Sequence, residues 1–414
     1  MRRTLDTVLD DRMTYEAAIA IDGPKGVGKT ATAVRRAAKT WRIDNEAERA
    51  ILQADPTFRD APSGTLLIDE WQHYPAIWDS VRRQVDDGAK PGRFLLTGSA
   101  TPLPGSGTHS GAGRIASVRM RPMALYERRH AEPTVSLSAL LSGTPGQITG
   151  TSALSAGDYY EAIVKSGLPG IFELSESRAA RRLEDYLRRV IDRDMAEQGY
   201  AVRRPETLRR WMSAYAAATS TTTSYATMLD TTTAGDGSQP ARSTTIAYRD
   251  RLSQLWLLDP VPAWQPRLNN PFKWLQHASK HQLADPALAA RLLGLNSTAL
   301  GSSHGAAMAG PLFEALATLT VRVAAEAADA RVGHLRTKNG DHEVDLVVEG
   351  FDGEVIGVEV KLAAHIDDRQ VRHLTWLRDQ LGDRVVDLVV LYSGTEAYRR
   401  RDGIAVVPLA LLGE

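Results

Sequence analysis

The glycine-rich stretch near the N-terminus constrains the fold of this chain more than any other feature. It reads Gly23-Pro24-Lys25-Gly26-Val27-Gly28-Lys29-Thr30, and it lies between an apolar run and a helix-forming stretch. This order of strand, loop and helix is typical of a phosphate-binding loop, because glycines let backbone N–H groups point inward and a helix N-terminus attracts anions. We predict that the whole loop binds ATP or GTP, with Lys29 at the β- and γ-phosphates and Thr30 on Mg²⁺. A chance glycine turn is the alternative.

Two later apolar runs end in polar residues, as buried parallel strands do where they meet a nucleotide. The run over residues 65–70 ends at Asp69 and Glu70. We predict that Asp69 holds the Mg²⁺ shell, directly or through water, and that Glu70 orients or deprotonates the attacking water. A third strand over residues 93–100 carries Thr97 and Ser99 at its tip, and either hydroxyl is a candidate to bond the γ-phosphate or the water.

Composition limits the classes of partner that the chain can have. Lysine plus arginine and aspartate plus glutamate each number 50, so net charge argues neither for nor against nucleic acid. Cysteine is absent, which excludes disulfides and thiolate metal sites. No apolar run approaches the roughly 18 residues that a membrane span needs. We therefore expect a cytoplasmic protein without a membrane partner.

The sequence patterns predict an α/β protein divided into four regions. In chain order these are a P-loop domain with a parallel sheet, a linker rich in Ser, Thr, Gly and Pro, a helical domain, and a second α/β domain. We place them at residues 1–130, 131–157, 158–300 and 301–414.

Within the first region, helices are expected over residues 31–41 and 75–85, with a short strand over residues 49–52. A loop over residues 102–107 follows the third strand, at the edge where open α/β sheets bind ligands. Arg114 is expected either to reach a phosphate, of this subunit or of a neighbouring one, or to form an ordinary salt bridge.

The helical region offers two hints of nucleic-acid binding. Residues 178–210 contain ten arginines against six acids, which suits either a nucleic-acid surface or a solvated helix face. Residues 216–245 are rich in Thr and Ser, and we expect a turn or a disordered tip at residues 235–238. Helices over residues 224–229 and 243–258, followed by a strand-like stretch, predict a winged-helix module. Such a module reads DNA or serves as a packing spacer.

The last region is predicted to have the element order α-β-β-β-α-β. Its first helix carries Glu314, and its second and third strands form a hairpin with Asp-Gly at the bend. We expect these elements over residues 310–328, 332–337, 343–349, 355–361, 368–381 and 385–391.

The register of this hairpin decides whether its charged residues meet. Period-two alternation puts Glu359 and Lys361 on one face. A three-residue loop would pair Asp345 with Lys361 and add it to that face, whereas a two-residue loop would turn Asp345 away. On a shared face, Asp345 and Glu359 would join Glu314 in an oxygen-rich pocket for Mg²⁺. Lys361 would then stabilise or activate a water that attacks a phosphate. An ordinary hairpin with its charges in water is the alternative.

Asp345, followed by Glu359-Val360-Lys361 and preceded by Glu314 on a helix, resembles the PD-(D/E)xK nuclease superfamily. Nearly the whole chain resembles the bacterial and archaeal AAA-type ATPases that join an N-terminal P-loop domain to a C-terminal nuclease-like domain of unknown function. Its Thr-rich segment departs from that family's pattern. Besides the motifs above, the matching residues are Leu96-Thr97-Gly98-Ser99, Gly113-Arg114, Gly167-Leu168-Pro169, Asp192-Arg193-Asp194, Lys280 with Asp285, and Leu312-Phe313-Glu314.

Three functions are compatible with these patterns and with the resemblance. The first is an ATPase whose nucleotide state gates a Mg²⁺-dependent nuclease acting on DNA or RNA, with Glu70, Asp345, Glu359 and Lys361 as catalytic residues. The second is a nucleotide-dependent switch that binds nucleic acid or a protein without cutting. The third is a remodelling or cargo-moving homo-oligomeric ring in which the C-terminal domain is structural.

Overall fold

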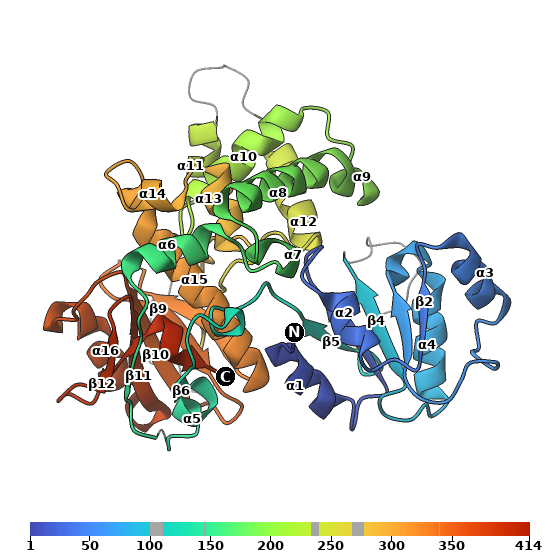
Figure 1. The fold of residues 1–414 in the computed structure, drawn as a ribbon, viewed down its shortest axis with the longest axis horizontal. Coiled ribbons are helices and arrows are strands. Elements are labelled where there is room, and N and C mark those ends of the chain that lie inside the picture. Colours follow the sequence, from blue (N-terminus) through green and yellow to red (C-terminus); the bar gives the residue numbers. More distant parts are fainter. Residues whose placement is uncertain (100–110, 145, 233–239, 267–276, 339) are drawn as a thin grey trace. The chain divides into compact units, whose positions relative to one another are not determined.

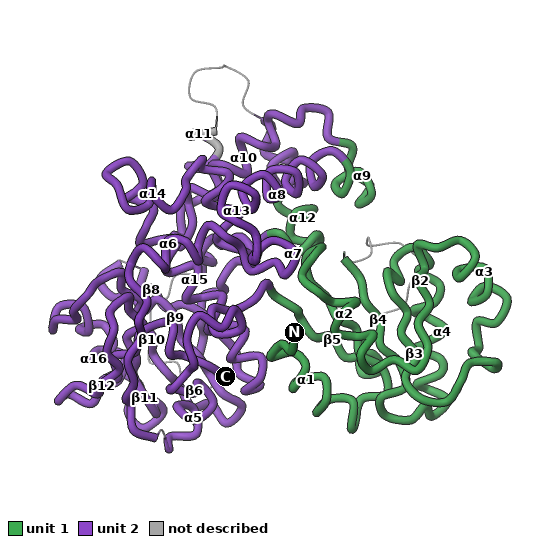
Figure 2. The backbone as a smooth tube through the Cα atoms, in the orientation of Figure 1, with its two compact units in different colours: residues 1–121, 193–201, 249–257 green, residues 122–192, 202–248, 258–414 purple. Residues whose placement is uncertain are grey.

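The computed structural model describes residues 1–99, 111–144, 146–232, 240–266, 277–338 and 340–414 (Figure 1). The chain forms two compact units, each assembled from segments that are separate in the sequence (Figure 2). Unit 1 comprises residues 1–121, 193–201 and 249–257, and unit 2 comprises residues 122–192, 202–248 and 258–414. Most of the predicted helical region and the predicted second α/β region therefore belong to one compact unit.

The described part of unit 1 is built on a five-stranded parallel sheet. Every residue of its two central apolar strands, β3 and β4, is buried, as expected for strands covered on both faces. Asp69 at the end of β3 pairs in register with Thr97 of β4. Across the sheet the strands are β2 (Lys39–Arg42), β3 (Leu66–Asp69), β4 (Phe94–Gly98), β1 (Ala18–Asp22) and β5 (Ala116–Arg119).

Apolar side chains from the helices and the sheet form the core of unit 1. Ile77 and Val81 of one helix pack with Ile68 and Leu96 of the sheet, and Phe58 joins them from a loop. The larger helices of this unit are α1 (Thr4–Arg12), α2 (Lys29–Val34), α3 (Glu46–Ala54) and α4 (Ala76–Asp86).

The structure corrects two predicted elements of unit 1. The helix expected over residues 31–41 ends at Val34, because residues 39–42 instead form β2 and pair with β3. The strand expected over residues 49–52 lies inside α3, whose first turn is capped by the side chain of Asn45. The alanine-rich stretch favours a helix locally, but pairing with a neighbouring strand overrides that preference. The loop predicted over residues 102–107 lies outside the described residues.

Unit 2 contains a seven-stranded mixed sheet in its described residues. The element order predicted from the sequence is present, from α15 (Ala306–Ala327) to β11, with α16 (Asp368–Leu381) between β10 and β11. The order by itself does not identify a nuclease. Across the sheet the strands are β7 (Gly150–Thr151), β12 (Glu396–Arg399), β13 (Ala405–Pro408), β11 (Val385–Tyr392), β10 (Val355–Lys361), β9 (Glu343–Glu349) and β8 (Arg331–Arg336).

The hairpin of β9 and β10 has neither of the two registers that the sequence left open. Val355 pairs with Glu349, not with Phe351, and Val358 pairs with Leu346. Continuing this register by one residue brings Glu359, not Lys361, opposite Asp345. This register differs by two residues from that of the three-residue loop, and side chains alternate with a period of two. Asp345 therefore lies on the face that the three-residue loop would give it, with Glu359 and Lys361.

The region predicted as a linker is part of unit 2. Its residues form β6 (Val135–Ser136), α5 (Leu137–Leu141) and β7. The strand β6 pairs with β14 (Leu412–Gly413) near the C-terminus, and β7 pairs with β12. Ser, Thr, Gly and Pro suggested a linker, but these pairings with residues far along the chain could not be read from local composition.

The helical part of the chain does not confirm a winged helix. Its predicted helices correspond to α11 and α12, but the strand-like stretch after them forms only isolated bridges, Leu258 with Leu283 and Val261 with Lys280. The turn predicted at residues 235–238 lies outside the described residues. The helices are α6 (Ala156–Val164), α7 (Pro169–Phe172), α8 (Glu176–Arg189), α9 (Met195–Glu197), α10 (Pro205–Ala217), α11 (Tyr225–Thr232), α12 (Arg242–Gln254), α13 (Pro286–Leu292) and α14 (Ser297–Leu300).

One helix, α15, is long and apolar enough among the described residues to cross a membrane, judged by length and composition alone. Of its apolar window, 61% is buried inside the protein, which is also how the core helix of a soluble protein looks. Leu312, Phe313 and Leu316 on this helix have no exposed surface. The helix therefore has a packing role in unit 2.

Candidate functional site

The glycine-rich loop has the backbone conformation that its glycines permit. Gly23, Gly26 and Gly28 have φ angles of 152°, 79° and 107°, which side-chain-bearing residues rarely adopt. A Cβ at Gly23 would lie only 2.2 Å from the carbonyl oxygen of Met120. The loop connects the end of β1 to the start of α2 at Lys29. Glycine is therefore required here by both conformation and space.

Lys29 is a buried cation whose hydrogen bonds go to uncharged groups. Its ammonium donates to the carbonyl oxygens of Gly23 at 2.7 Å and Pro24 at 2.9 Å. Only 6% of the residue is exposed. Burial lowers the pKa of Lys29 to about 8, although the negative charges of Glu70 and Asp22 oppose this shift. An anionic ligand at this loop would therefore relieve a desolvated positive charge.

The strand tips bring the predicted metal and water-activating residues together. The Thr30 hydroxyl donates to Asp69 Oδ1 at 2.7 Å, and the Thr97 hydroxyl donates to the same oxygen. The Ser99 hydroxyl donates to Glu70 Oε1 at 3.0 Å. These are hard oxygen ligands, and Mg²⁺ is usually held by one or two protein carboxylates with waters and substrate phosphates. Thr30 and Asp69 thus fit a magnesium ion.

Two further residues of the predicted nucleotide site, Lys25 and Arg114, form ion pairs with acidic side chains. Lys25 donates to Asp194 and Glu197 of the segment over residues 193–201, which is part of unit 1. Arg114 pairs with Asp86 of α4, its Nε lying 2.8 Å from Oδ1, and this is the ordinary salt bridge that the sequence left open. The carbonyl oxygen of Val27 accepts a hydrogen bond from Arg3, a contact that no sequence pattern indicated.

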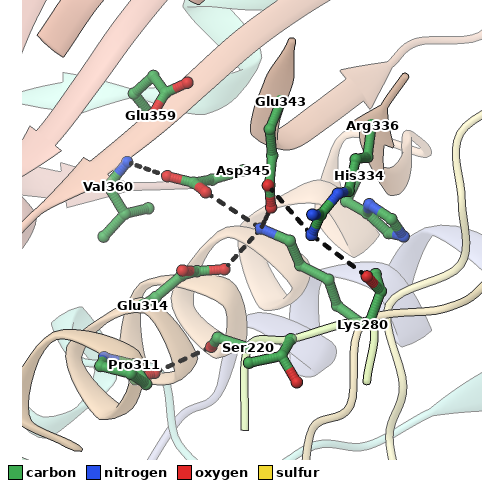
Figure 3. A network of polar contacts seen from close by, with 12 residues as sticks. Ser220, Lys280, Pro311, Glu314, His334, Arg336, Glu343, Asp345, Glu359 and Val360 are labelled. Atoms are coloured by element: carbon green, nitrogen blue, oxygen red, sulfur yellow. Dashed lines mark hydrogen bonds and ion pairs between the residues drawn. The ribbon is translucent and has the colours of Figure 1, made fainter. Parts of the chain in front are cut away.

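Unit 2 contains a second cluster of charged side chains, and a lysine lies at its centre (Figure 3). Lys280 Nζ is 3.0 Å from both Glu314 Oε1 and Asp345 Oδ1, and 3.1 Å from Glu343 Oε1. The Lys280 side chain is 1% exposed. Its backbone exchanges two hydrogen bonds of 2.9 Å with Val261, which hold the residue in place. The sequence marked Lys280, Glu314 and Asp345 separately but did not indicate that they pair.

Asp345, Glu359 and Lys361 also meet, as the shared face requires. Lys361 Nζ lies 2.7 Å from Glu359 Oε2 and 3.6 Å from Asp345 Oδ2. The Val360 N–H donates to Asp345 Oδ2 at 3.0 Å (Figure 3). Glu359 Oε1 is buried, and no hydrogen-bond partner for it is found among the described residues.

Burial and charge set different protonation states in this cluster. Burial raises the pKa of Glu314 to about 7, although the charge of Lys280 opposes the shift. Burial and the charge of Asp345 raise the pKa of Glu359 well above its ordinary value. Burial would also raise the pKa of Asp345, but Lys280 and Lys361 together hold it well below its usual range. The surroundings therefore favour ionisation of Asp345 and oppose ionisation of Glu359.

The cluster as arranged does not fit the predicted Mg²⁺. Among the described residues, no group of three or more acidic or histidine side chains is placed to hold a metal ion. The position between Glu314 and Asp345 is taken by the ammonium of Lys280. A divalent cation at this position would first require Lys280 to move, because two cations cannot share so small a space.

Asp285 and Gly167, which belong to two other sequence motifs, contact each other and have a structural role. Asp285 accepts hydrogen bonds from the hydroxyl of Ser166 and from the backbone N–H of Gly167, both at 2.7 Å. It also caps α13 through the N–H of Ala287. The two motifs, far apart in the sequence, thus join two helical segments of unit 2.

The comparison with protein families divides the chain into three parts. Residues 15–128 match the model of a family described as an AAA domain. This stretch forms an AAA-type P-loop domain. Residues 156–299 match a domain of unknown function (DUF8612), and residues 309–412 match another domain of unknown function (DUF4143). The matches for residues 156–299 and 309–412 name no activity.

Relatives along nearly the whole chain, and solved structures similar to part of it, are also known. Uncharacterized proteins of Mycobacterium bovis and Mycobacterium tuberculosis are each 26% identical over 405 residues, covering 94% of this chain and 79% of theirs. A Walker-type ATPase of Pyrococcus abyssi is 12% identical with a TM-score of 0.39, covering 70% of this chain and 95% of its own. The ORC2 protein of Aeropyrum pernix, in ADPNP and ADP complexes, is 13% identical with a TM-score of 0.31, covering 70% and 90%. The similarity of these two structures is too distant to decide fold or activity.

Proposed function

We propose that the AAA domain binds ATP with Mg²⁺ and hydrolyses it. The observation that carries this proposal is Lys29, a desolvated ammonium in a glycine loop whose hydrogen bonds go to two backbone carbonyls. A phosphate would offer this ammonium a charged partner in place of neutral ones. The hydroxyl of Thr30 and the carboxylate of Asp69, 2.7 Å apart, would hold the metal ion beside it.

The neighbouring side chains suit the hydrolytic step. When bound, Mg²⁺ would neutralise charge that develops on the phosphates. In this proposal Glu70 orients the attacking water or accepts its proton, and the hydroxyl of Ser99 donates a hydrogen bond of 3.0 Å to this carboxylate. Thr97 is kept at Asp69 by its own hydrogen bond. In the proposal, each of these residues therefore has a separate task.

The proposal is tested by substituting Lys29. We expect Lys29→Ala to weaken ATP binding by at least about 100-fold, since a charge-assisted contact to phosphate is lost. Lys90→Ala, which removes an exposed lysine of the same domain, should leave binding unchanged. Isothermal titration with ATP and MgCl₂ measures both. Unaltered affinity in Lys29→Ala would contradict the proposed nucleotide site.

A second substitution separates binding from hydrolysis. Asp69 acts mainly through the metal ion in this proposal, so Asp69→Asn should reduce Mg²⁺-dependent phosphate release more than it reduces ATP binding. A coupled phosphate-release assay and the same titration give the two values. An equal loss of both would assign Asp69 a structural role.

We further propose that the nucleotide state controls the output of unit 2, and two outputs are considered. Asp345, Glu359 and Lys361 on one face favour a nuclease acting on DNA or RNA. Lys280 among the acids favours a switch that binds nucleic acid or a protein without cutting. The second output agrees better with the geometry. Metal-dependent cleavage would require the Lys280 ammonium to leave the position between Glu314 and Asp345 so that a metal ion could bind there.

Plasmid DNA incubated with the protein, ATP and either Mg²⁺ or Mn²⁺ distinguishes the two outputs. The switch predicts no nicking. Nicking that disappears in Lys361→Ala, and persists in the exposed-surface variant Arg401→Ala, would establish the nuclease instead. Molecular mass measured with and without ATP tests a homo-oligomeric ring, because a chain that stays monomeric with nucleotide bound forms none.

A further inference from the structure

Lys25, the third residue of the phosphate-binding loop, has two carboxylate partners within unit 1. Its ammonium lies 2.7 Å from Asp194 Oδ1 and 3.1 Å from Glu197 Oε2. The side chain of Asp194 is 5% exposed, whereas those of Lys25 and Glu197 are 36% and 48% exposed. These contacts, called the Lys25 ion pair below, attach the loop to the segment over residues 193–201.

The position of Asp194 in the chain is unusual. It is the last residue of a π-helical turn over Val190–Asp194, between α8 and α9. Single π turns within helices are rare and occur frequently at functional sites. The segment over residues 193–201 packs with unit 1, whereas the chain on both sides of it belongs to unit 2 (Figure 2). A movement of this segment would therefore be passed along the chain to α8 and α10.

The charges at this position oppose a bound polyphosphate. Burial by itself would lower the pKa of Lys25, but Asp194 and Glu197 outweigh that influence and raise it, so the ammonium is charged. A nucleotide in the loop would bring several further negative charges close to these two carboxylates. The phosphates and the two carboxylates would then compete for an ion pair with the Lys25 ammonium. Asp194 is nearly buried, and a buried carboxylate that loses its cation is strongly disfavoured.

We propose that nucleotide binding competes with the Lys25 ion pair and thereby releases the segment over residues 193–201. This inference rests on the proposed binding of ATP at the loop. Asp194 is then a positioning residue that lowers nucleotide affinity, and by thermodynamic linkage ATP weakens the hold of Lys25 on Asp194 to the same degree. The π turn is the element that changes between the two states.

Neutral variants of the acids test the competition through ATP affinity. Asp194→Asn keeps the shape of the side chain and removes its charge, and it should tighten ATP binding by about tenfold, within the usual range of coupling between sites. Asp192→Asn is the matched control, because it removes an exposed carboxylate from the same π turn, and it should change affinity less than about twofold. An affinity for ATP that is unchanged or weaker in Asp194→Asn overturns the inference.

Hydrogen exchange gives a second readout that does not depend on the stability of one variant. In the wild-type protein, amides of residues 193–201 should exchange faster after ATP is added, and Lys25→Met without nucleotide should show the same faster exchange. Slower or unchanged exchange in the wild type with ATP bound overturns the inference. A wild-type protein that binds no ATP refutes the proposed function itself, whereas one that binds ATP with no response at Asp194 refutes only the competition.

Discussion

Lys29 in unit 1 and Lys280 in unit 2 are both buried cations, but they have opposite surroundings. Lys29 donates to two backbone carbonyls, while Lys280 is surrounded by three carboxylates within 3.1 Å. Burial lowers the pKa of Lys29 to about 8. Burial acts on Lys280 in the same direction, yet the charges of Glu314 and Asp345 more than reverse it and raise its pKa well above the ordinary value.

This difference indicates what each site is prepared to bind. A desolvated cation with neutral hydrogen-bond partners is stabilised when an anion arrives, so the loop around Lys29 is suited to phosphate. A cation that already has three acidic partners needs no ligand, and its acids have less to offer a metal ion. The loop around Lys29 can therefore accept an anion as it stands, whereas the charged cluster in unit 2 must rearrange before it can bind a metal ion.

The largest expected effect is on stability, and it compares the two lysines directly. Lys280→Met leaves buried carboxylates without their cation and should lower local stability around β9 and β10 by about 3–5 kcal/mol. Lys29→Met removes a cation whose hydrogen bonds go to two backbone carbonyls. It should lower the stability of the loop and β1 by less, about 1–2 kcal/mol, because the cost of burying the ammonium is removed together with these two bonds. Hydrogen exchange of these strands without nucleotide measures both. Equal losses would break the comparison.

The next effect concerns ATP affinity and pH. Because the free protein has a Lys29 pKa of about 8 and phosphate binds the charged form, affinity should fall roughly tenfold between pH 7 and pH 9. Between about pH 8 and the ordinary lysine pKa of 10.5, the folded state binds fewer protons at Lys29 than the unfolded state does. The contribution of Lys29 to the free energy of unfolding therefore rises with pH in this range. Lys29→Arg stays charged and should flatten the affinity profile. A flat profile in the wild type would contradict the lowered pKa.

The smallest effect concerns the acids around Lys280. Glu314 has a pKa of about 7 in the folded protein, above its ordinary 4.5, through burial and despite the charge of Lys280. The folded state therefore holds a proton that the unfolded state loses, and its contribution to stability falls as pH rises from about 4.5 to 7. Glu314→Gln does not lose stability in this way, so its free energy of unfolding relative to that of the wild type should increase by about 1 kcal/mol between pH 6 and pH 8.

Urea unfolding at the two pH values measures this change in relative stability. Glu326→Gln, on the same helix α15, is the control and should show no such trend. A relative stability of Glu314→Gln that falls with rising pH would show that Glu314 is ionised at low pH and that Lys280 dominates its environment.

Local sequence patterns were sufficient to predict much of the geometry of the candidate nucleotide-binding site. Glycines with a lysine and a threonine between a strand and a helix predicted the loop, and apolar runs ending in polar residues placed Asp69 and Thr97 each at the tip of a strand. The side-chain period of two also placed Glu359 with Lys361, whereas the side of Asp345 depended on a register that the sequence left open. In each case the determining pattern lies within a few residues of the site.

Only the tertiary structure determined which charges compensate one another. Lys280 is 65 residues from Asp345, Lys25 is 169 residues from Asp194, and Arg114 is 28 residues from its partner Asp86. The strand β7, from the predicted linker, similarly pairs with β12 near the other end of unit 2. Sequence patterns report the conformation of short segments, because backbone geometry repeats over a few residues. The partner of a buried charge depends on which distant segments pack together, and that is decided by burial and pairing over the whole unit.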